Sequence, residues 1–255
     1  MMTNSKAFEV LKGQTQSSLD FAVLCCNAVP ALKGYIKALE AEKVKKLPNA
    51  DYFKGDPNLE QLKSFSTSYK KNLGKLLFIN TFSYFESYFK ELISEIKDFH
   101  GGKDSFKDAA IKKRKQHILF SDRTETSAHA NKLREYKKGT HLSKYRKHIS
   151  ALEHTDFRFP SEMLSTFGLI ELFGSYSDLK ASQIPYVAEH AFGVEFSKNE
   201  IEEFSKLRDL RNKIAHGKVS QVEFKKAIEM NYFMRQLALK IDKHVVKHFL
   251  VIEFI

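Results

Sequence analysis

The sequence contains little cysteine and no tryptophan. Cys25 and Cys26 are the only cysteines in 255 residues, and they are adjacent. Neighbouring cysteines are poorly placed to bond to each other, and two cysteines make no disulfide framework. The composition therefore excludes a disulfide-stapled fold and fits a reducing cytoplasm.

Long apolar runs are also missing. The run from Phe21 to Leu32 is too short to span a bilayer and contains Pro30, and the first ten residues do not resemble a signal peptide. The sequence thus predicts a soluble, cytoplasmic protein with no membrane partner.

Several common catalytic motifs are absent. The stretch His244-Val-Val-Lys-His248 puts two histidines on one helical face, but it lacks the glutamate and the third ligand of a zinc site. Gly101-Gly-Lys103 lacks the first glycine and the Ser/Thr of a phosphate loop, and no Gly-x-Ser-x-Gly elbow occurs. We therefore expect neither a bound metal nor a cofactor.

Basic residues are in excess. Lysine and arginine number 42 against 31 acidic residues, so the net charge is +11 and the pI is about 9.4. Such a balance favours a polyanionic partner such as nucleic acid. The alternative is a basic protein whose charged surface is merely solvated.

Apolar periodicity indicates helices throughout, and no strand pattern with turn chemistry is evident. Residues 5 to about 47 read as two helices broken at Pro30, and residues 49–57 as a linker. A long helix follows over residues 58–100. One side of it carries a stripe of six large apolar residues, Phe78, Phe82, Phe85, Phe89, Leu92 and Ile96, so we expect a central core helix.

The rest of the chain has the same helical character. Apolar residues return after Pro160, through Phe173, and residues 176–192 read as two helical turns. Ser197 and Glu200 fit a capping box that starts a helix ending at His216, because Gly217 can adopt the left-handed conformation that closes it. A second box, Ser220 and Glu223, predicts a last helix running to the C-terminus. The two-residue link between these helices predicts antiparallel packing.

The helix over residues 197–216 has an apolar stripe and a polar face. Leu207, Leu210 and Ile214 share the stripe. The polar face holds Ser205, Arg208, Asp209, Asn212 and His216. Arg211 lies about 140° around the helix from His216, so one ideal helix would not aim both at one ligand. A second chain, or an unwound last turn, would bring them together.

Arg211-Asn-Lys-Ile-Ala-His216 resembles the Arg-x4–6-His motif of the HEPN superfamily, in which a polar residue follows the arginine. Phe82-Ser-Tyr-Phe-Glu-Ser-Tyr-Phe-Lys-Glu-Leu92 is similar to the first helix of the RiboL-PSP and MAE-28990-like HEPN subfamilies. The resemblance implies an all-α HEPN-type bundle over residues 58–255. It does not cover residues 1–57, which we expect to form a helical N-terminal extension, or residues 103–158, whose basic composition indicates short helices in a surface insertion.

The resemblance also implies a function. Many HEPN proteins are metal-independent endoribonucleases that act as homodimers, in toxin or antiphage defence systems with partner proteins such as antitoxins. His216 would be the acid and base, since imidazole titrates near neutrality, and Arg211 would hold the phosphate through its charged fork. Asn212 would assist both, Arg208 and Asp209 would support the site, and Glu86 would orient Arg211 or His216.

These residues could instead have purely structural roles. His216 can simply favour the helix C-terminus while Arg211 pairs with Asp209 or another acid, and Glu86 can be a solvated carboxylate. On that view the chain is a non-catalytic HEPN-like module that binds RNA, nucleotide or protein.

A basic segment is the second candidate for RNA contact. Its cations lie near tyrosine and histidine rings that can stack on bases, although such runs are often only solvated surface. The candidate residues are Lys112, Lys113, Arg114, Lys115, Lys144, Arg146 and Lys147.

Overall fold

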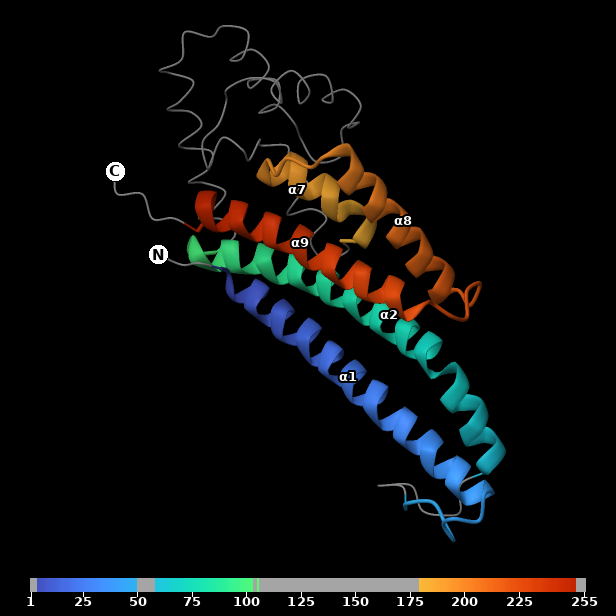
Figure 1. Ribbon diagram of the computed structural model, residues 1–255. Coiled ribbons are helices and arrows are strands. Elements are labelled where there is room, and N and C mark those ends of the chain that lie inside the picture. Colours follow the sequence, from blue (N-terminus) through green and yellow to red (C-terminus); the bar gives the residue numbers. More distant parts are fainter. Residues whose placement is uncertain (1–3, 50–57, 103–104, 106–178, 251–255) are drawn as a thin grey trace, which may run out of the picture. The chain divides into compact units, whose positions relative to one another are not determined.

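The computed structural model describes residues 4–49, 58–102, 105 and 179–250. Every regular element in this part of the chain is helical, which confirms the all-α fold (Figure 1). The elements are α1 (Lys6–Glu40), α2 (Leu59–Phe99), the short 3₁₀ helix η1 (Ala181–Gln183), α7 (Ile184–Phe192), α8 (Lys198–Ala215) and α9 (Phe224–His248). Apart from residue 105, the predicted insertion at 103–158 lies outside the described residues, as do the apolar segment after Pro160 and most of the predicted linker.

The described residues divide into two compact units, and each long helix contributes to both. The first unit draws on Met1–Leu11, Phe85–Arg208 and Arg235–Ile255. The second draws on Lys12–Tyr84 and Asp209–Met234.

Aromatic side chains form the core of the first unit. Phe85 and Phe89 of α2 are completely buried. The ring of Phe85 lies 5.9 Å from that of Phe204 in α8, and the ring of Phe89 lies 6.1 Å from that of Phe192 in α7. Phe192 also packs edge-on against Phe249, with ring centroids 5.2 Å apart. Such tilted and edge-on pairs suit the charge distribution of aromatic rings.

The N-terminus of α1 is fixed in this unit by acidic side chains. Both the backbone N–H and the hydroxyl of Ser5 donate to the buried carboxylate of Asp242 in α9. The Glu95 carboxylate accepts from the backbone N–H groups of Lys6 and Ala7, at 3.0 Å each. These acids satisfy amides that a helix leaves without partners at its start and oppose the positive end of its dipole.

Burial strongly affects two ionisable groups near this anchor. Burial raises the pKa of Tyr88 well above its usual value, and the nearby acids Asp242 and Glu95 add to the shift. Its hydroxyl donates to the carbonyl of Ala238 at 3.0 Å. Burial also raises the pKa of Asp242, against the lowering effect of the hydrogen bonds from Ser5. In both cases burial makes the charged form less favourable than it is in water.

In the second unit the apolar stripe of α2 continues through Leu77, Phe78 and Phe82, all buried. Together with Phe85, Phe89, Leu92 and Ile96 in the first unit, this confirms the predicted core face of the long helix. A buried polar pair accompanies the stripe: Asn231 of α9 donates its amide to the hydroxyl of Thr81 at 2.9 Å.

Gly74 permits a close approach of backbones in the same unit. A Cβ added there would collide with the carbonyl oxygen of Val222 and lie 3.1 Å from the Cα of Phe224. The N–H of Val222 reaches the carbonyl of Lys71 at 3.4 Å. The segment leading into α9 thus runs directly against α2.

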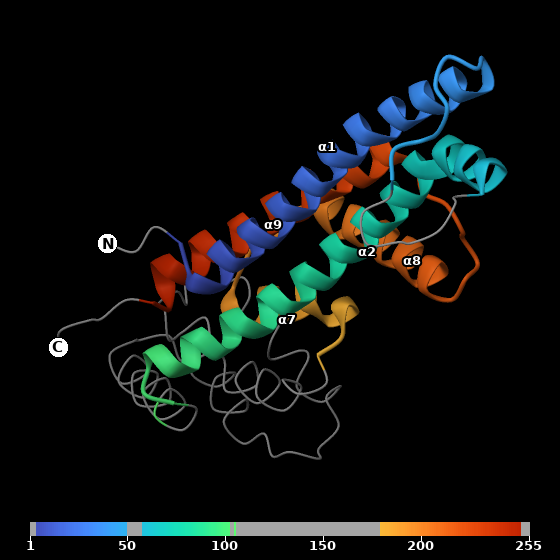
Figure 2. The same cartoon turned by 90° about the horizontal axis from the view of Figure 1, so that it is seen from below.

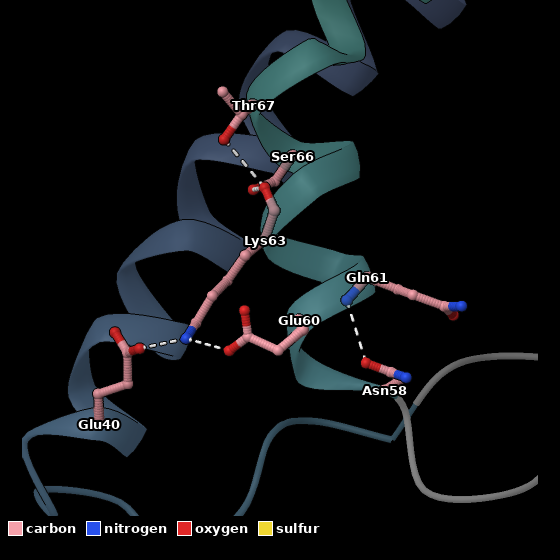
Figure 3. Close-up of polar contacts among 7 residues, drawn as sticks. All are labelled: Glu40, Asn58, Glu60, Gln61, Lys63, Ser66 and Thr67. Carbon is pink, nitrogen blue, oxygen red and sulfur yellow. Dashed lines mark hydrogen bonds and ion pairs between the residues drawn. The ribbon is translucent and has the colours of Figure 1, made fainter.

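Lys63 joins the end of α1 to the start of α2 in the second unit (Figure 3). Its Nζ lies 2.5 Å from Glu40 and 2.7 Å from Glu60, and these partners raise its pKa. Figures 1 and 2 both show these two helix ends side by side. Asn58 caps α2, because its side-chain oxygen accepts from the N–H of Gln61 at 3.1 Å.

Two sequence predictions about helix boundaries were wrong. Helix α1 is continuous from Lys6 to Glu40 with Pro30 inside it, rather than two helices broken at the proline. Ala22 and Ile36 are buried on either side of Pro30, and this packing offsets the missing hydrogen bond. Helix α9 begins at Phe224, so eight residues rather than two connect it to α8, and it ends at His248.

The length and composition of α1 meet the requirements for crossing a membrane. An 18-residue window within it has a mean hydropathy of 1.3, and 11% of that window is buried. One such helix near the N-terminus is weak evidence for a membrane span. The prediction that Phe21–Leu32 is too short took no account of the unbroken helix around it.

Candidate functional site

Helix α8 begins with the predicted capping box. The N–H of Ser197 donates to Glu200 at 2.7 Å, and the N–H of Glu200 donates to the Ser197 hydroxyl at 3.3 Å. Lys240 of α9 adds an ion pair to Glu200 at 2.7 Å. Partial burial of Glu200 opposes ionisation, but the hydrogen bonds from Lys240 and Ser197 outweigh it and lower the pKa of the carboxyl.

The other end of α8 closes at the predicted glycine. Gly217 has a φ of 71°, in the left-handed region, and its N–H bonds to the carbonyl of Ile214 at 3.0 Å. The N–H of Lys218 bonds to the carbonyl of Lys213 at 2.9 Å. This pair of bonds is the Schellman arrangement, which satisfies the last carbonyls of a helix. The helix end is thus defined by the backbone and does not depend on the side chains of the candidate site.

The two faces of α8 separate as predicted. Phe204, Leu207 and Ile214 are buried, and Leu210 is half-buried. Asp209, Asn212 and His216 are exposed, whereas Arg208 and Arg211 are half-buried. His216 lies one residue beyond the end of α8, and its backbone N–H bonds to the carbonyl of Asn212 at 3.0 Å. The imidazole is therefore accessible to a ligand.

Two of the three predicted catalytic residues are in contact. Arg211 Nη1 donates to Asn212 Oδ1 at 3.3 Å, which is long for a hydrogen bond. In an ideal helix, five residues of separation would set Arg211 and His216 about 140° apart, so one copy of α8 is not expected to direct both at a single phosphate.

The supporting residues are divided between the two units. Arg208 and Glu86 belong to the first unit, whereas Asp209, Arg211, Asn212 and His216 belong to the second. The roles predicted for Arg208, Asp209 and Glu86 remain predictions. The proposed RNA-binding residues of the basic segment, Lys112, Lys113, Arg114, Lys115, Lys144, Arg146 and Lys147, lie outside the described residues.

The pair His244 and His248 has a structural setting. Their rings lie 4.6 Å apart, and His244 Nε2 lies 2.7 Å from the carbonyl oxygen of Phe192. Burial lowers the pKa of His244 and also that of His248, and the charge of Lys247 adds to both shifts. Within the described ranges, no three histidine, cysteine or acidic residues are grouped to hold a metal ion.

Sequence reasoning missed the contribution of Lys240 to the positioning of α8. It lies 40 residues beyond Glu200 in the chain, and no motif links the two. Its Nζ also lies 5.6 Å from the centroid of the Phe196 ring, just before the cap. A lysine on the exposed face of a long helix resembles any solvated lysine until its neighbour is known.

Comparison with known proteins gives one match. A model of the RiboL-PSP-HEPN family matches residues 52–247, a range that includes the phenylalanine-rich face of α2 and all of α8. No curated protein and no solved structure matches the chain. Because the match covers more than half of the chain, this protein belongs to the RiboL-PSP-HEPN family of helical domains, a membership that points to a nuclease or RNA-related function.

Proposed function

We propose that this protein is a metal-independent endoribonuclease whose site is formed by Arg211, Asn212 and His216 at the end of α8. The main support is the placement of His216: an accessible imidazole stands just beyond a helix end that its backbone holds firmly. Family membership and the net charge of +11 support RNA as the ligand.

In the proposed reaction, the ribose 2′-OH attacks the adjacent phosphorus and the bond from phosphorus to the 5′ oxygen breaks. A base takes the proton of the 2′-OH, and an acid gives a proton to the leaving 5′ oxygen, so the products are a 2′,3′-cyclic phosphate and a 5′-OH. His216 supplies proton transfer. Arg211 stabilises the negative charge that builds on the phosphate, and Asn212 positions the arginine.

The proposal includes a homodimer. Since Arg211 and His216 diverge around one helix, two α8 ends brought together would place the arginine of one copy near the histidine of the other. We further propose that the protein acts in the cytoplasm as a toxin or antiphage defence effector controlled by an antitoxin or a partner protein.

RNA cleavage in the presence of a chelator tests the proposal. We expect His216→Ala to lower the rate by on the order of 10²–10⁴ and Arg211→Ala to lower it by about 10²–10³. Lys213→Ala is the matched control, because it removes one positive charge from the same last turn of α8. It should change the rate by less than about threefold.

The outcomes separate the alternatives. Equal cleavage by the parent and both site variants would end the nuclease proposal. RNA binding without cleavage by the parent, weakened by Arg211→Ala, would make the protein a non-catalytic RNA-binding HEPN module. Toxicity on expression, relieved by the site substitutions but not by Lys213→Ala, is the matching observation in cells.

A further inference from the structure

The outward face of α1 carries an apolar stripe with coiled-coil spacing. Phe21, Leu24, Ala28, Ala31 and Tyr35 follow one another at alternating steps of three and four, and we call these five residues the outer seam. All five are exposed, with Leu24 at 62%, Phe21 at 56% and Tyr35 at 48%. Alternating steps of three and four are the spacing by which one helix packs along another.

The outer seam lies opposite the face that α1 uses within the protein. Ala22 and Ile36 are buried, and both belong to the second unit, as does the whole seam. If α1 left the fold to enter a bilayer, Ala22 and Ile36 would lose their contacts in the core. A partner of the outer seam must therefore bind α1 while the helix remains packed in the protein.

The width and charge of the outer seam disfavour a membrane surface. At 100° per residue the seam spans about 80°, narrower than the apolar face of a typical surface helix but suited to a single partner helix. The exposed polar side chains of Asp20 and Asn27 flank it on one side. Asp20 is also the only charged residue between Gly13 and Leu32, and its sign repels anionic lipid.

Charge likewise disfavours an acidic protein partner. The seam contains no lysine or arginine to meet one, whereas the chain as a whole carries +11. Copies of so basic a protein repel each other across most of their surface, and least where charge is missing. The neutral stretch from Gly13 to Leu32 therefore suits a second copy.

The order of side-chain sizes gives the orientation. In an antiparallel pair of α1 helices, a two-fold axis level with residue 26 puts Leu24 opposite Ala28 and Phe21 opposite Ala31. The same axis places Ser17 opposite Tyr35. Large side chains then meet small ones throughout, which packs the contact without gaps. A parallel pair would set Phe21 against Phe21 and leave space between the alanines.

We propose that the protein self-associates through the outer seam, with two α1 helices packed antiparallel. This surface precedes the matched family region of residues 52–247 and is separate from Arg211 and His216. The inference therefore does not rest on ribonuclease activity. With two alanines among five contacts we expect a modest affinity, with a Kd on the order of 1–100 µM.

Neighbouring residues offer a matched test by sedimentation of the full chain. Leu24 and Val23 are equally exposed, at 62% and 61%, but only Leu24 lies in the outer seam. The proposed α8 homodimer would be common to the parent and both variants, so the readout is the association that depends on Leu24. We expect the parent to form a larger species with rising concentration and Leu24→Lys to weaken that step at least about tenfold. Val23→Lys adds the same charge and should leave the affinity within about twofold, with helical circular dichroism unchanged in both.

Cross-linking tests the orientation, in a Cys25→Ser, Cys26→Ser background. A mixture of Leu24→Cys and Ala28→Cys chains should form a disulfide-linked pair faster than either alone. A parent that stays monomeric to about 100 µM, or that associates equally well with Leu24→Lys, would overturn the proposal. So would a parent that stays monomeric in solution and binds anionic phosphatidylserine vesicles through Leu24.

Discussion

At the level of single residues, burial of an ionisable side chain shifts its pKa and so makes stability depend on pH. His244 is the clearest case, because its ring lies against the carbonyl oxygen of Phe192 in the core of the first unit. At 2.7 Å this contact requires a proton on Nε2, so the neutral ring serves as the donor. Burial disfavours a second proton and lowers the pKa of the imidazole below its usual value.

This shift predicts how stability depends on pH. Because the folded pKa lies below that of the unfolded chain, the unfolded state binds more protons in acid. The stability contributed by His244 is complete above the unfolded pKa of about 6.5 and is lost as the pH falls below it. We expect His244→Gln, whose amide can still donate to Phe192, to lose less stability than the parent between pH 7.5 and 5.

Urea unfolding at the two pH values measures this difference. His248, whose pKa is also lowered, contributes the same trend to both proteins, and Asp242 contributes an opposite one to both. These effects cancel when the variant is compared with the parent. Stability curves that run parallel across this range would show that His244 does not titrate differently on folding.

At the scale of the helices, close backbone contact decides where glycine is needed. Gly74 of α2 faces the carbonyl of Val222 and the start of α9. Gly34 lies in α1 with open space around the position of its absent side chain. The two glycines therefore predict opposite responses to the same substitution.

Gly74→Ala should lower the free energy of unfolding by about 1–3 kcal/mol, because neither backbone segment can yield as a flexible side chain would. Gly34→Ala should raise it by about 0.5–1 kcal/mol through better helix propensity. Denaturant unfolding of both variants checks the pair. A stabilised Gly74→Ala would mean that α2 and the segment before α9 are less closely packed than described.

Helix positions and faces were largely predictable from the sequence, because they depend on nearby residues. The apolar face of α2 follows from its phenylalanine spacing, and α8 is capped at Ser197 and Gly217. All of these features depend on residues within a few helical turns of one another. Pro30 misled for the opposite reason: its local cost is real, but burial of Ala22 and Ile36 outweighs it. Ser220 satisfied a capping pattern, yet α9 begins four residues later, at Phe224, where the chain packs against Gly74 of α2.

The candidate site was predictable only in part. That His216 stands accessible at a helix end followed from Gly217 and the polar face of α8. The contact of Arg211 with Asn212 and the ion pair of Lys240 with Glu200 depend on side-chain conformation and on long-range packing. Neither contact can therefore be predicted from the sequence alone.

At the scale of the whole molecule, α1 belongs to the fold although it precedes the matched family region. It supplies Phe8 to the first unit, where the ring of Phe8 packs against that of Tyr88 at 6.1 Å, and Ser5 lies just before its first residue. It supplies Ala22, Ile36 and Glu40 to the second. Both units are therefore incomplete without it.

A fragment of residues 49–255 should consequently fail to fold cooperatively. Loss of the buried side chains of Phe8, Leu11 and Ile36 alone removes about 5–9 kcal/mol of burial, comparable with the whole stability of a typical domain. Thermal unfolding followed by circular dichroism measures the effect. A chain lacking only residues 1–4 keeps Ser5 and should melt much like the parent, and a sharp melt of the longer deletion would contradict the prediction.

The bond between Ser5 and Asp242 spans 237 positions of the chain, and this distance has a consequence for biosynthesis. A ribosome adding about 5–20 residues per second takes on the order of ten to fifty seconds to make the second partner after the first. During that interval the nascent N-terminal helix has no α9 to receive it. The apolar surface from Gly13 to Leu32 then stays accessible to chaperones until α9 has been synthesised.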